Sequence, residues 1–256
     1  MVLPMMKRTI EDVAVIGKDS IRQLDAIELG IDGAMILVDK GPNWTSFDVV
    51  ARLRSILRIK RIGHCGTLDP MATGLLQICI GPATKFVDSF QASEKEYVGT
   101  MKMGATTPSD DAETDVVATF PVEHLTSEML HAAANVFVGE IDQIPPMFSA
   151  RKVDGKRLYS IARKGEVIER PSRSVIIRMF KLTDIRLPEI DFHVVCSKGT
   201  YIRSLVRDFG AHVSSGAHLT RLRRTRSGEY DVKNALTIDE FAAYYGLPGS
   251  SRRVVA

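Results

Sequence analysis

Residues 63–74 read Gly-His-Cys-Gly-Thr-Leu-Asp-Pro-Met-Ala-Thr-Gly. The glycines of this loop permit tight turns and the close approach of a ligand to the backbone. Asp69 is its only carboxylate. An Asp followed by Pro is also a common helix start, with Asp as the N-cap and Pro at the first helical position. The residues therefore allow two interpretations, a ligand-binding loop or a helix cap, and spacing alone favours the cap.

Strands and helices are expected on both sides of this loop. The run 34–38 predicts a buried strand, Thr45 or Ser46 begins a helix that extends to Leu57, and 75–80 predicts a second buried strand. The other expected elements are strands at 96–103, 173–187 and 190–197, an edge strand at 217–226, and helices at 126–139, 156–164 and 201–213. Strands and helices do not alternate strictly, which favours an α+β fold with a mixed, mainly antiparallel central sheet flanked by helices and loops.

The composition is that of a globular protein. The chain has 256 residues, 45% hydrophobic and 25% charged, enough for one large domain or a domain with an extension. No apolar run approaches the roughly 18 residues that span a bilayer. The three cysteines form no Cys-x-x-Cys pair, which favours a reducing, cytoplasmic setting. We expect an N-terminal extension of unknown role at 1–30, a catalytic domain at 31–245 and a C-terminal tail at 246–256.

Positive charge is unevenly distributed, although the net charge is only +3. Residues 51–61 contain five Lys or Arg and no acid, and residues 151–173 contain eight against three acids. Such segments on one face would form an anion-binding surface larger than a single metabolite requires. Ordinary solvated faces explain the same charges equally well.

Common cofactor and metal motifs are absent from the sequence. It contains no GxxxxGK[ST], GxGxxG, HExxH or GxSxG pattern, which argues against nucleotide-driven and zinc chemistry. We therefore expect no cofactor and no metal. Adjacent residues of an extended loop point to opposite sides, so His64 and Cys65 are better explained by packing or substrate contact than as a metal pair.

Six segments, in chain order, resemble one family. The loop is similar to GHTGTLDPLATGLL of the TruB family of pseudouridine synthases and differs only at Cys65 and Met71. The other matches are with LDKPxGxTS at 38–46, QxPPxYSA at 143–150, part of GKRLYE at 156–159, CSKGTYIR at 196–203 and LRRTRSG at 222–228. The resemblance covers about Ile31 to Phe241. It implies the pseudouridine synthase fold and the isomerisation of a tRNA uridine, typically the T-loop uridine called position 55, to pseudouridine.

The resemblance also implies the catalytic residues. Asp69 would attack C1′ of the ribose or C6 of the base, or assist loss of uracil as a glycal, and the residues do not decide between these routes. Arg203 would keep Asp69 charged and oriented. Tyr97 would contact the flipped-out base and move a proton. Asp111 aligns with a family acid, but Pro108 and Thr114 replace the usual neighbours, which leaves its role open.

Further expectations concern RNA binding and partners. The residues implied in substrate contact are His64, Tyr201, Lys40, Leu219, Arg151, Lys152, Lys156 and Arg157, the last four within an RNA-gripping insertion at about 143–166. The partner is the T-arm stem-loop of tRNA, with no membrane, no obligatory protein partner and a monomeric state. Only 25 residues follow Asp231, too few for the C-terminal PUA domain of many members. A non-catalytic tRNA-binding folding helper is the alternative function.

Overall fold

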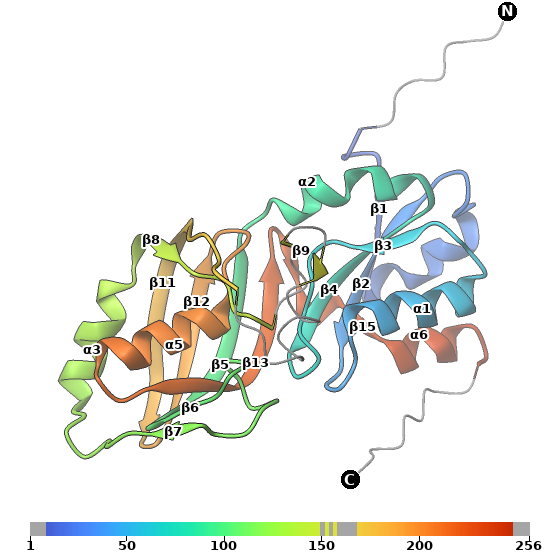
Figure 1. Cartoon of the computed structure of the whole chain (residues 1–256). Coiled ribbons are helices and arrows are strands. Elements are labelled where there is room, and N and C mark those ends of the chain that lie inside the picture. The colour runs from blue at the N-terminus through green and yellow to red at the C-terminus, as the bar shows by residue number, and fades with distance from the viewer. Residues whose placement is uncertain (1–8, 149–151, 154–155, 158–167, 248–256) are drawn as a thin grey trace, which may run out of the picture. The chain divides into compact units, whose positions relative to one another are not determined.

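The computed structural model describes residues 9–148, 152–153, 156–157 and 168–247 (Figure 1). The chain divides into two compact units, one formed by residues 1–93 and 224–256 and the other by residues 94–223. Both contain sheet and helix in irregular order, so the predicted α+β fold is confirmed. The sheet is mixed and mainly antiparallel, also as predicted.

The first unit is built around β2 (Ala34–Lys40). This strand pairs antiparallel with β4 (Thr73–Ile80) and parallel with β1 (Ala14–Ile16) and β15 (Leu236–Thr237). The remaining elements of this unit are β3 (Ile62–His64), β14 (Tyr230–Asp231), α1 (Ser46–Leu57), α2 (Val87–Gln91), α6 (Ile238–Tyr244), and the 3-10 helices η1 (Lys18–Ala26), η2 (Gly81–Phe86) and η3 (Val232–Asn234).

Helix α1 forms where its sequence predicts it. The Thr45 hydroxyl caps its first turn by accepting a hydrogen bond from the backbone N–H of Asp48, whose side chain reaches back to Thr45. The apolar residues recur at helical spacing and are buried: Val49, Val50, Leu53 and Ile56. The helix ends at Arg58, in the left-handed conformation. These features fix α1 on the sheet with its N-terminus at the end of the β2–α1 loop.

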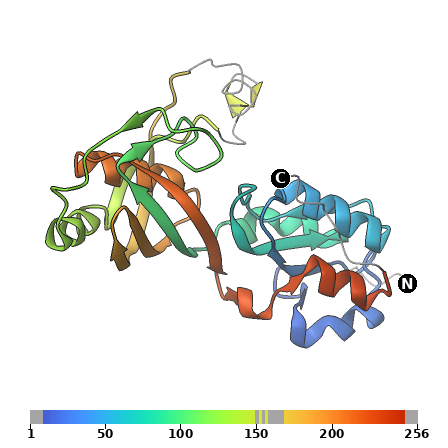
Figure 2. The same cartoon turned by 90° about the horizontal axis from the view of Figure 1, so that it is seen from below.

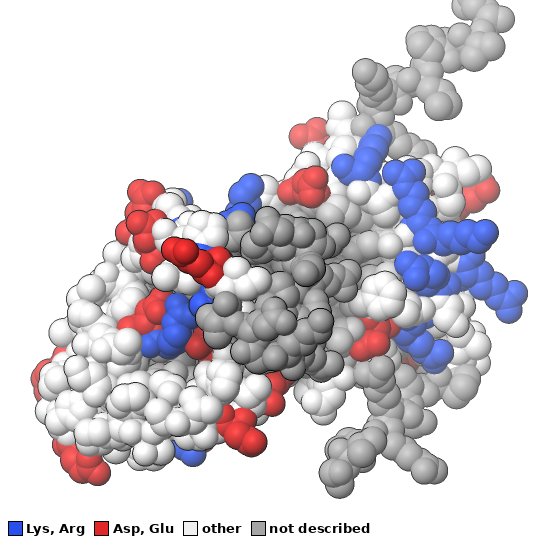
Figure 3. Space-filling model, viewed as in Figure 1, with Lys and Arg blue, Asp and Glu red and all other residues white. Residues whose placement is uncertain are grey.

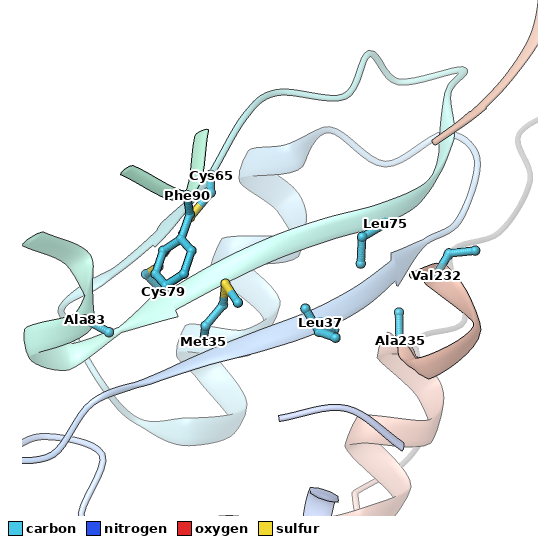
Figure 4. Close-up of a cluster of buried hydrophobic side chains, with 9 residues drawn as sticks. All are labelled: Met35, Leu37, Cys65, Leu75, Cys79, Ala83, Phe90, Val232 and Ala235. Atoms are coloured by element: carbon cyan, nitrogen blue, oxygen red, sulfur yellow. Dashed lines mark hydrogen bonds between the residues drawn. The ribbon is translucent and has the colours of Figure 1, made fainter. Parts of the chain in front are cut away.

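One face of the first sheet is sealed by a compact apolar cluster (Figure 4). Alternate residues of a strand point to the same face, which brings Met35 and Leu37 of β2 together with Leu75 and Cys79 of β4. Phe90 of α2 points onto Met35 and Cys79 (Figure 4). These buried side chains hold β4, and therefore the loop that precedes it, in a fixed position.

Gly74 allows two strands to approach closely. Its φ is +99°, and a Cβ at this position would lie 2.2 Å from the carbonyl oxygen of Arg224 in β13 (Ala217–Ser227). We expect Gly74→Ala to lower the melting temperature more than Gly139→Ala does. Gly139 also has a positive φ, but its Cβ would meet nothing within 4 Å, so only backbone strain of about 1–2 kcal/mol applies there. Equal melting temperatures of the two variants would contradict this explanation.

The second unit is an antiparallel sheet covered by helices. Strand β5 (Lys95–Met103) pairs with β12 (Glu189–Cys196), which pairs with β11 (Arg173–Arg186), and β11 pairs with β8 (Gly139–Gln143). Phe180 of β11 packs against Phe209 of α5 (Ile202–His212) at a ring distance of 5.6 Å. The other elements are α3 (Ser127–Val136), β6 (Ala105–Thr106), β7 (Ala118–Thr119), β9 (Lys152–Val153) and β10 (Lys156–Arg157).

Two expectations about the fold are corrected, and one helix is added. Strand β13, one long strand (Figure 2), is not an edge strand: it lies between β4 and β5 in the sheet order, and β14 also pairs with it. Lys156–Arg157 form β10, paired with β9, where a helix was expected, and 158–164 lie outside the described residues. The helix α6 was not foreseen.

Within the segment expected as an N-terminal extension, β1 joins the sheet of the first unit and η1 follows it. No described helix is long and apolar enough to cross a membrane.

Candidate active site

Asp69 lies in a turn and not at a helix N-terminus. The backbone N–H of Ala72 donates to the carbonyl of Asp69 at 3.1 Å, and the chain then enters β4 directly at Thr73. The helix-cap interpretation of the Asp-Pro pair is therefore wrong. Asp69 is partly exposed, whereas Leu68 before it is buried. The loop thus keeps the Asp69 carboxylate accessible next to a buried residue, Leu68.

Ser46 fixes the residue before Asp69. Its hydroxyl lies in the first turn of α1 and is buried. It accepts a hydrogen bond from the N–H of Leu68 at 2.9 Å and donates to the carbonyl of Leu68 at 3.1 Å. One side chain therefore satisfies both backbone groups of a buried residue that no strand or helix pairs.

Lys40 fixes the residue after Asp69. It is fully buried at the end of β2, and its Nζ donates to the carbonyls of Gly41, Trp44 and Pro70 at 3.0, 2.7 and 3.1 Å. The N–H of Asn43 donates to the same Pro70 carbonyl at 2.9 Å. Carbonyl oxygens offset the cost of burying the ammonium group. The β2–α1 segment thus holds the chain on both sides of Asp69, while the contact of Lys40 with substrate stays a prediction.

His64, the last residue of β3, and the buried Cys65 lie at the start of the same loop. Burial, followed by the nearby charge of Arg224, lowers the pKa of His64 and favours its neutral form. Arg224 is itself buried and donates through Nε to the carbonyl of Leu75 at 2.7 Å.

Cys65 and Cys79 are free thiols whose sulfur atoms lie 3.3 Å apart. The hydrogen bond between them, together with burial, raises the pKa of Cys79. Neutral thiols are poor nucleophiles, which agrees with a packing role.

Arg203 is buried at the start of α5 and joins three segments of the second unit. Its two terminal nitrogens donate to the carbonyls of Ser109 at 2.9 Å and Phe148 at 2.7 Å. The Asp111 carboxylate lies 3.5 Å from one of them. The five-donor guanidinium suits such a junction because it satisfies several acceptors in one plane.

Asp111, whose role the sequence left open, is held firmly. Its carboxylate accepts hydrogen bonds from the Ser109 hydroxyl at 2.5 Å and the Glu113 N–H at 3.0 Å. The hydroxyl of Thr114, which replaces the usual glycine, accepts a hydrogen bond from the Ser109 backbone N–H and forms a second hydrogen bond with the Ser109 hydroxyl. The departures from the family pattern are therefore accommodated by local hydrogen bonds, and Asp111 faces Arg203.

The segment that enters the expected insertion is attached to the N-terminal half of α5. Gln143 makes two side-chain hydrogen bonds with the backbone of Tyr201, at 2.7 and 3.0 Å. Ser204 and Arg207 both donate to the carbonyl of Ile144. Gln143 stands in the QxPP motif, but its partner is 58 positions away, so neither this contact nor the role of Arg207 was foreseen.

The other expected site residues are distributed over both units. Tyr97 is buried in β5, opposite Val194 of β12, and Leu219 is buried in β13 with its N–H bonded to the carbonyl of Asp110. Asp69, Lys40 and His64 belong to the first unit, whereas Tyr97, Tyr201, Arg203 and Leu219 belong to the second. The pairing of Asp69 with Arg203 stays a prediction.

The expected RNA contacts of the insertion are only partly described. Arg151 lies outside the described residues, and of Lys152, Lys156 and Arg157 only the backbone, which forms β9 and β10, is described. Among the described residues, no group of His, Cys, Asp and Glu could hold a metal ion.

Two family models match consecutive parts of the chain. Residues 54–202 match the TruB family pseudouridylate synthase N-terminal domain, and residues 203–250 match the tRNA pseudouridylate synthase B C-terminal domain. The chain belongs to the TruB family of pseudouridine synthases. Family members named tRNA pseudouridine synthase B come from Flavobacterium johnsoniae, 54% identical over 82% of this chain and 95% of that protein, and from Phocaeicola vulgatus, 49% identical over 82% and 92%.

Two solved structures match most of this chain. The archaeal box H/ACA sRNP Nop10-Cbf5 complex matches with a TM-score of 0.63 and 29% identity. That match covers 85% of this chain and 55% of the other. An H/ACA RNP bound to a substrate RNA containing 2′-deoxyuridine matches with a TM-score of 0.64 and 25% identity, over 96% of this chain and 62% of the other. The present chain thus spans little more than half the length of these solved chains.

Proposed function

We propose that this TruB-family isomerase converts the T-loop uridine of tRNA, position 55, to pseudouridine with Asp69 as the catalytic carboxylate. The observation that carries the proposal is the position of Asp69, which is accessible between two residues fixed by buried side chains. A catalytic group held in this way loses little entropy when the substrate binds. The names of the similar proteins support tRNA as the substrate.

The reaction needs no external group. The C1′–N1 bond of the uridine breaks, the uracil turns, a C1′–C5 bond forms, and the proton on C5 is exchanged for one on N1. Asp69 attacks C1′ or C6, or assists loss of uracil as a glycal. Tyr97 offers a ring to the extruded base and a hydroxyl for the late proton transfer, and Arg203 keeps the Asp69 carboxylate ionised. His64, Tyr201, Lys40 and Leu219, with the insertion residues 151, 152, 156 and 157, form the substrate contacts.

In this proposal, the protein acts in the cytoplasm as a monomer and needs no protein partner. One experiment tests it: the purified chain is incubated with an unmodified T-arm stem-loop, and pseudouridine is mapped by carbodiimide modification. Product at the T-loop uridine is expected. Tight binding of the stem-loop with no product would favour the folding helper instead.

The contacts around Asp69 predict a specific effect of Ser46. Ser46→Ala removes both hydrogen bonds to Leu68, at a cost of about 1–3 kcal/mol in stability, and loosens the loop. We expect kcat to fall about 10- to 100-fold, because misplacing a catalytic group by an ångström has effects of that size. The measurement is single-turnover pseudouridine formation at saturating enzyme.

Thr45→Ala is the matched control for Ser46→Ala. It removes the N-cap of the same helix at about 1 kcal/mol, but Thr45 does not touch Leu68. Thr45→Ala should therefore lower stability and leave kcat close to that of the unmodified chain. Equal losses of kcat in the two variants would mean that the start of α1, and not the pair of Ser46–Leu68 hydrogen bonds, fixes the conformation of the loop.

A further inference from the structure

The outward face of α1 carries an exposed aromatic ring and a row of cations. Phe47, in the first turn, is 65% exposed, whereas the opposite face of the helix is buried. Residues four and seven positions apart share one side of a helix, so Phe47, Ala51 and Arg54 lie in one stripe that leads to Arg58 at the C-cap. An exposed phenylalanine at the start of a charged stripe is not needed for packing.

The positive charge continues beyond the helix. After the left-handed turn at Arg58 come Lys60 and Arg61, both exposed. Arg61 donates to the Thr84 hydroxyl in η2, which places Lys85 next to the same surface. Figure 3 shows Lys and Arg side chains gathered over α1 and β3. The surface formed by Phe47, Arg54, Arg58, Lys60, Arg61 and Lys85 is called the α1 surface below.

Few negative charges lie in the segments that form this surface. Between residues 48 and 87 the only acids are Asp48 and Asp69, and the Asp48 carboxylate is bonded at the helix cap. In the part of the chain that the structure describes, Arg58, Lys60 and Arg61 form no ion pair. Cations at a helix C-terminus also complement its dipole, which explains Arg54 and Arg58. That effect does not reach Lys60, Arg61 or Lys85, and it gives Phe47 no role.

The α1 surface begins at the Asp69 loop. Phe47 directly follows Ser46, whose hydroxyl holds Leu68, so the aromatic end of the stripe is the end nearer the candidate catalytic loop. From Phe47 to Arg58 the helix rises about 16 Å. A chain of several nucleotides that leaves the loop in this direction would meet the ring first and the guanidinium groups afterwards.

We propose that the α1 surface binds the sugar-phosphate backbone of the RNA substrate, with phosphates against Arg54, Arg58, Lys60 and Arg61 and one base stacked on Phe47. The proposal rests on the proposed function for the identity of the RNA. Phosphate contacts give sequence-independent, salt-dependent affinity, and aromatic rings stack with any base. The surface therefore increases the affinity for the RNA and orients its backbone along α1, but it does not select the uridine.

The test is the salt dependence of tRNA binding by the full chain. We expect Arg58→Gln/Lys60→Gln/Arg61→Gln to weaken binding of unmodified full-length tRNA in filter-binding assays. The slope of log K against log salt concentration should decrease by about 2 to 3, because each lost phosphate contact removes about 0.7 to 0.9. Phe47→Ala should weaken binding about 5- to 150-fold with an unchanged slope, since stacking contributes about 1–3 kcal/mol per base. Phe47→Trp should retain the affinity.

Arg22→Gln/Lys233→Gln is the matched control, because both cations are exposed in the same unit and belong to η1 and η3, outside the α1 surface. The proposal is overturned if this control lowers the slope as much as the triple variant, or if the triple variant binds like the unmodified chain. An unchanged affinity of Phe47→Ala would overturn the stacking contact. Because binding and product formation are measured separately, an unmodified chain that binds tRNA with this salt dependence but makes no pseudouridine would refute only the proposed function.

Discussion

Asp69→Asn is expected to lower pseudouridine formation by at least about 10⁴-fold, the scale on which removal of a nucleophile acts in other enzymes. Asparagine has the same shape as aspartate but carries no charge and is a far weaker nucleophile. Because the neighbours of Asp69 are held by Ser46 and Lys40, the loop should keep its conformation in this variant. The loss should therefore appear in the chemical step, measured by single-turnover assays and carbodiimide mapping.

Binding and stability separate this effect from misfolding. We expect Asp69→Asn to bind unmodified tRNA nearly as tightly as the unmodified chain and to melt at a similar temperature. Asp88→Asn makes the same chemical change on the exposed side of α2, in the same unit, and should keep full activity. Undiminished product from Asp69→Asn would remove Asp69 from the mechanism, whichever of the three routes the reaction follows.

The sequence predicted the elements whose signals are local. Helix α1 has its capping threonine and its buried residues at helical spacing within 12 residues, and β2 and β4 are short apolar runs. Such patterns can be recognised without knowledge of the rest of the chain. The TruB resemblance supplied the candidate residues, because its motifs lie in order along the chain. These two sources were enough for the α+β class and for the loop that carries Asp69.

The sequence did not predict the contacts that hold the site, because their partners are distant in the chain. Lys40 meets the carbonyl of Pro70 across 30 positions, and Ser46 meets Leu68 across 22. No periodic pattern marks a side chain that bonds to a backbone carbonyl of another segment. The helix-cap interpretation of Asp69 failed for a related reason: a local preference for Asp-Pro at helix starts is overridden when the next residues pair in a sheet. Strand β13 was mistaken for an edge because its pairing partners are remote.

Arg203→Met is expected to destabilise the chain by about 3–5 kcal/mol, which is the usual cost of removing one partner from a buried ion pair. The substitution leaves the Asp111 carboxylate buried without its cation and removes donors from the carbonyls of Ser109 and Phe148. Since the total stability of a domain is about 5–15 kcal/mol, this is a large fraction. Urea unfolding followed by circular dichroism measures the change.

Arg178→Met is the matched control, because Arg178 pairs with Glu94 at 3.6 Å on the surface of the same unit and such pairs contribute only about 0–1 kcal/mol. The double variant Arg203→Met/Asp111→Asn should recover part of the loss, since no unpaired buried charge remains. If Arg203→Met is as stable as Arg178→Met but inactive well below its melting temperature, Arg203 acts on the substrate or on Asp69 alone. If both stability and activity fall, and the double variant regains stability without activity, Arg203 joins the segments of the second unit and also serves the reaction.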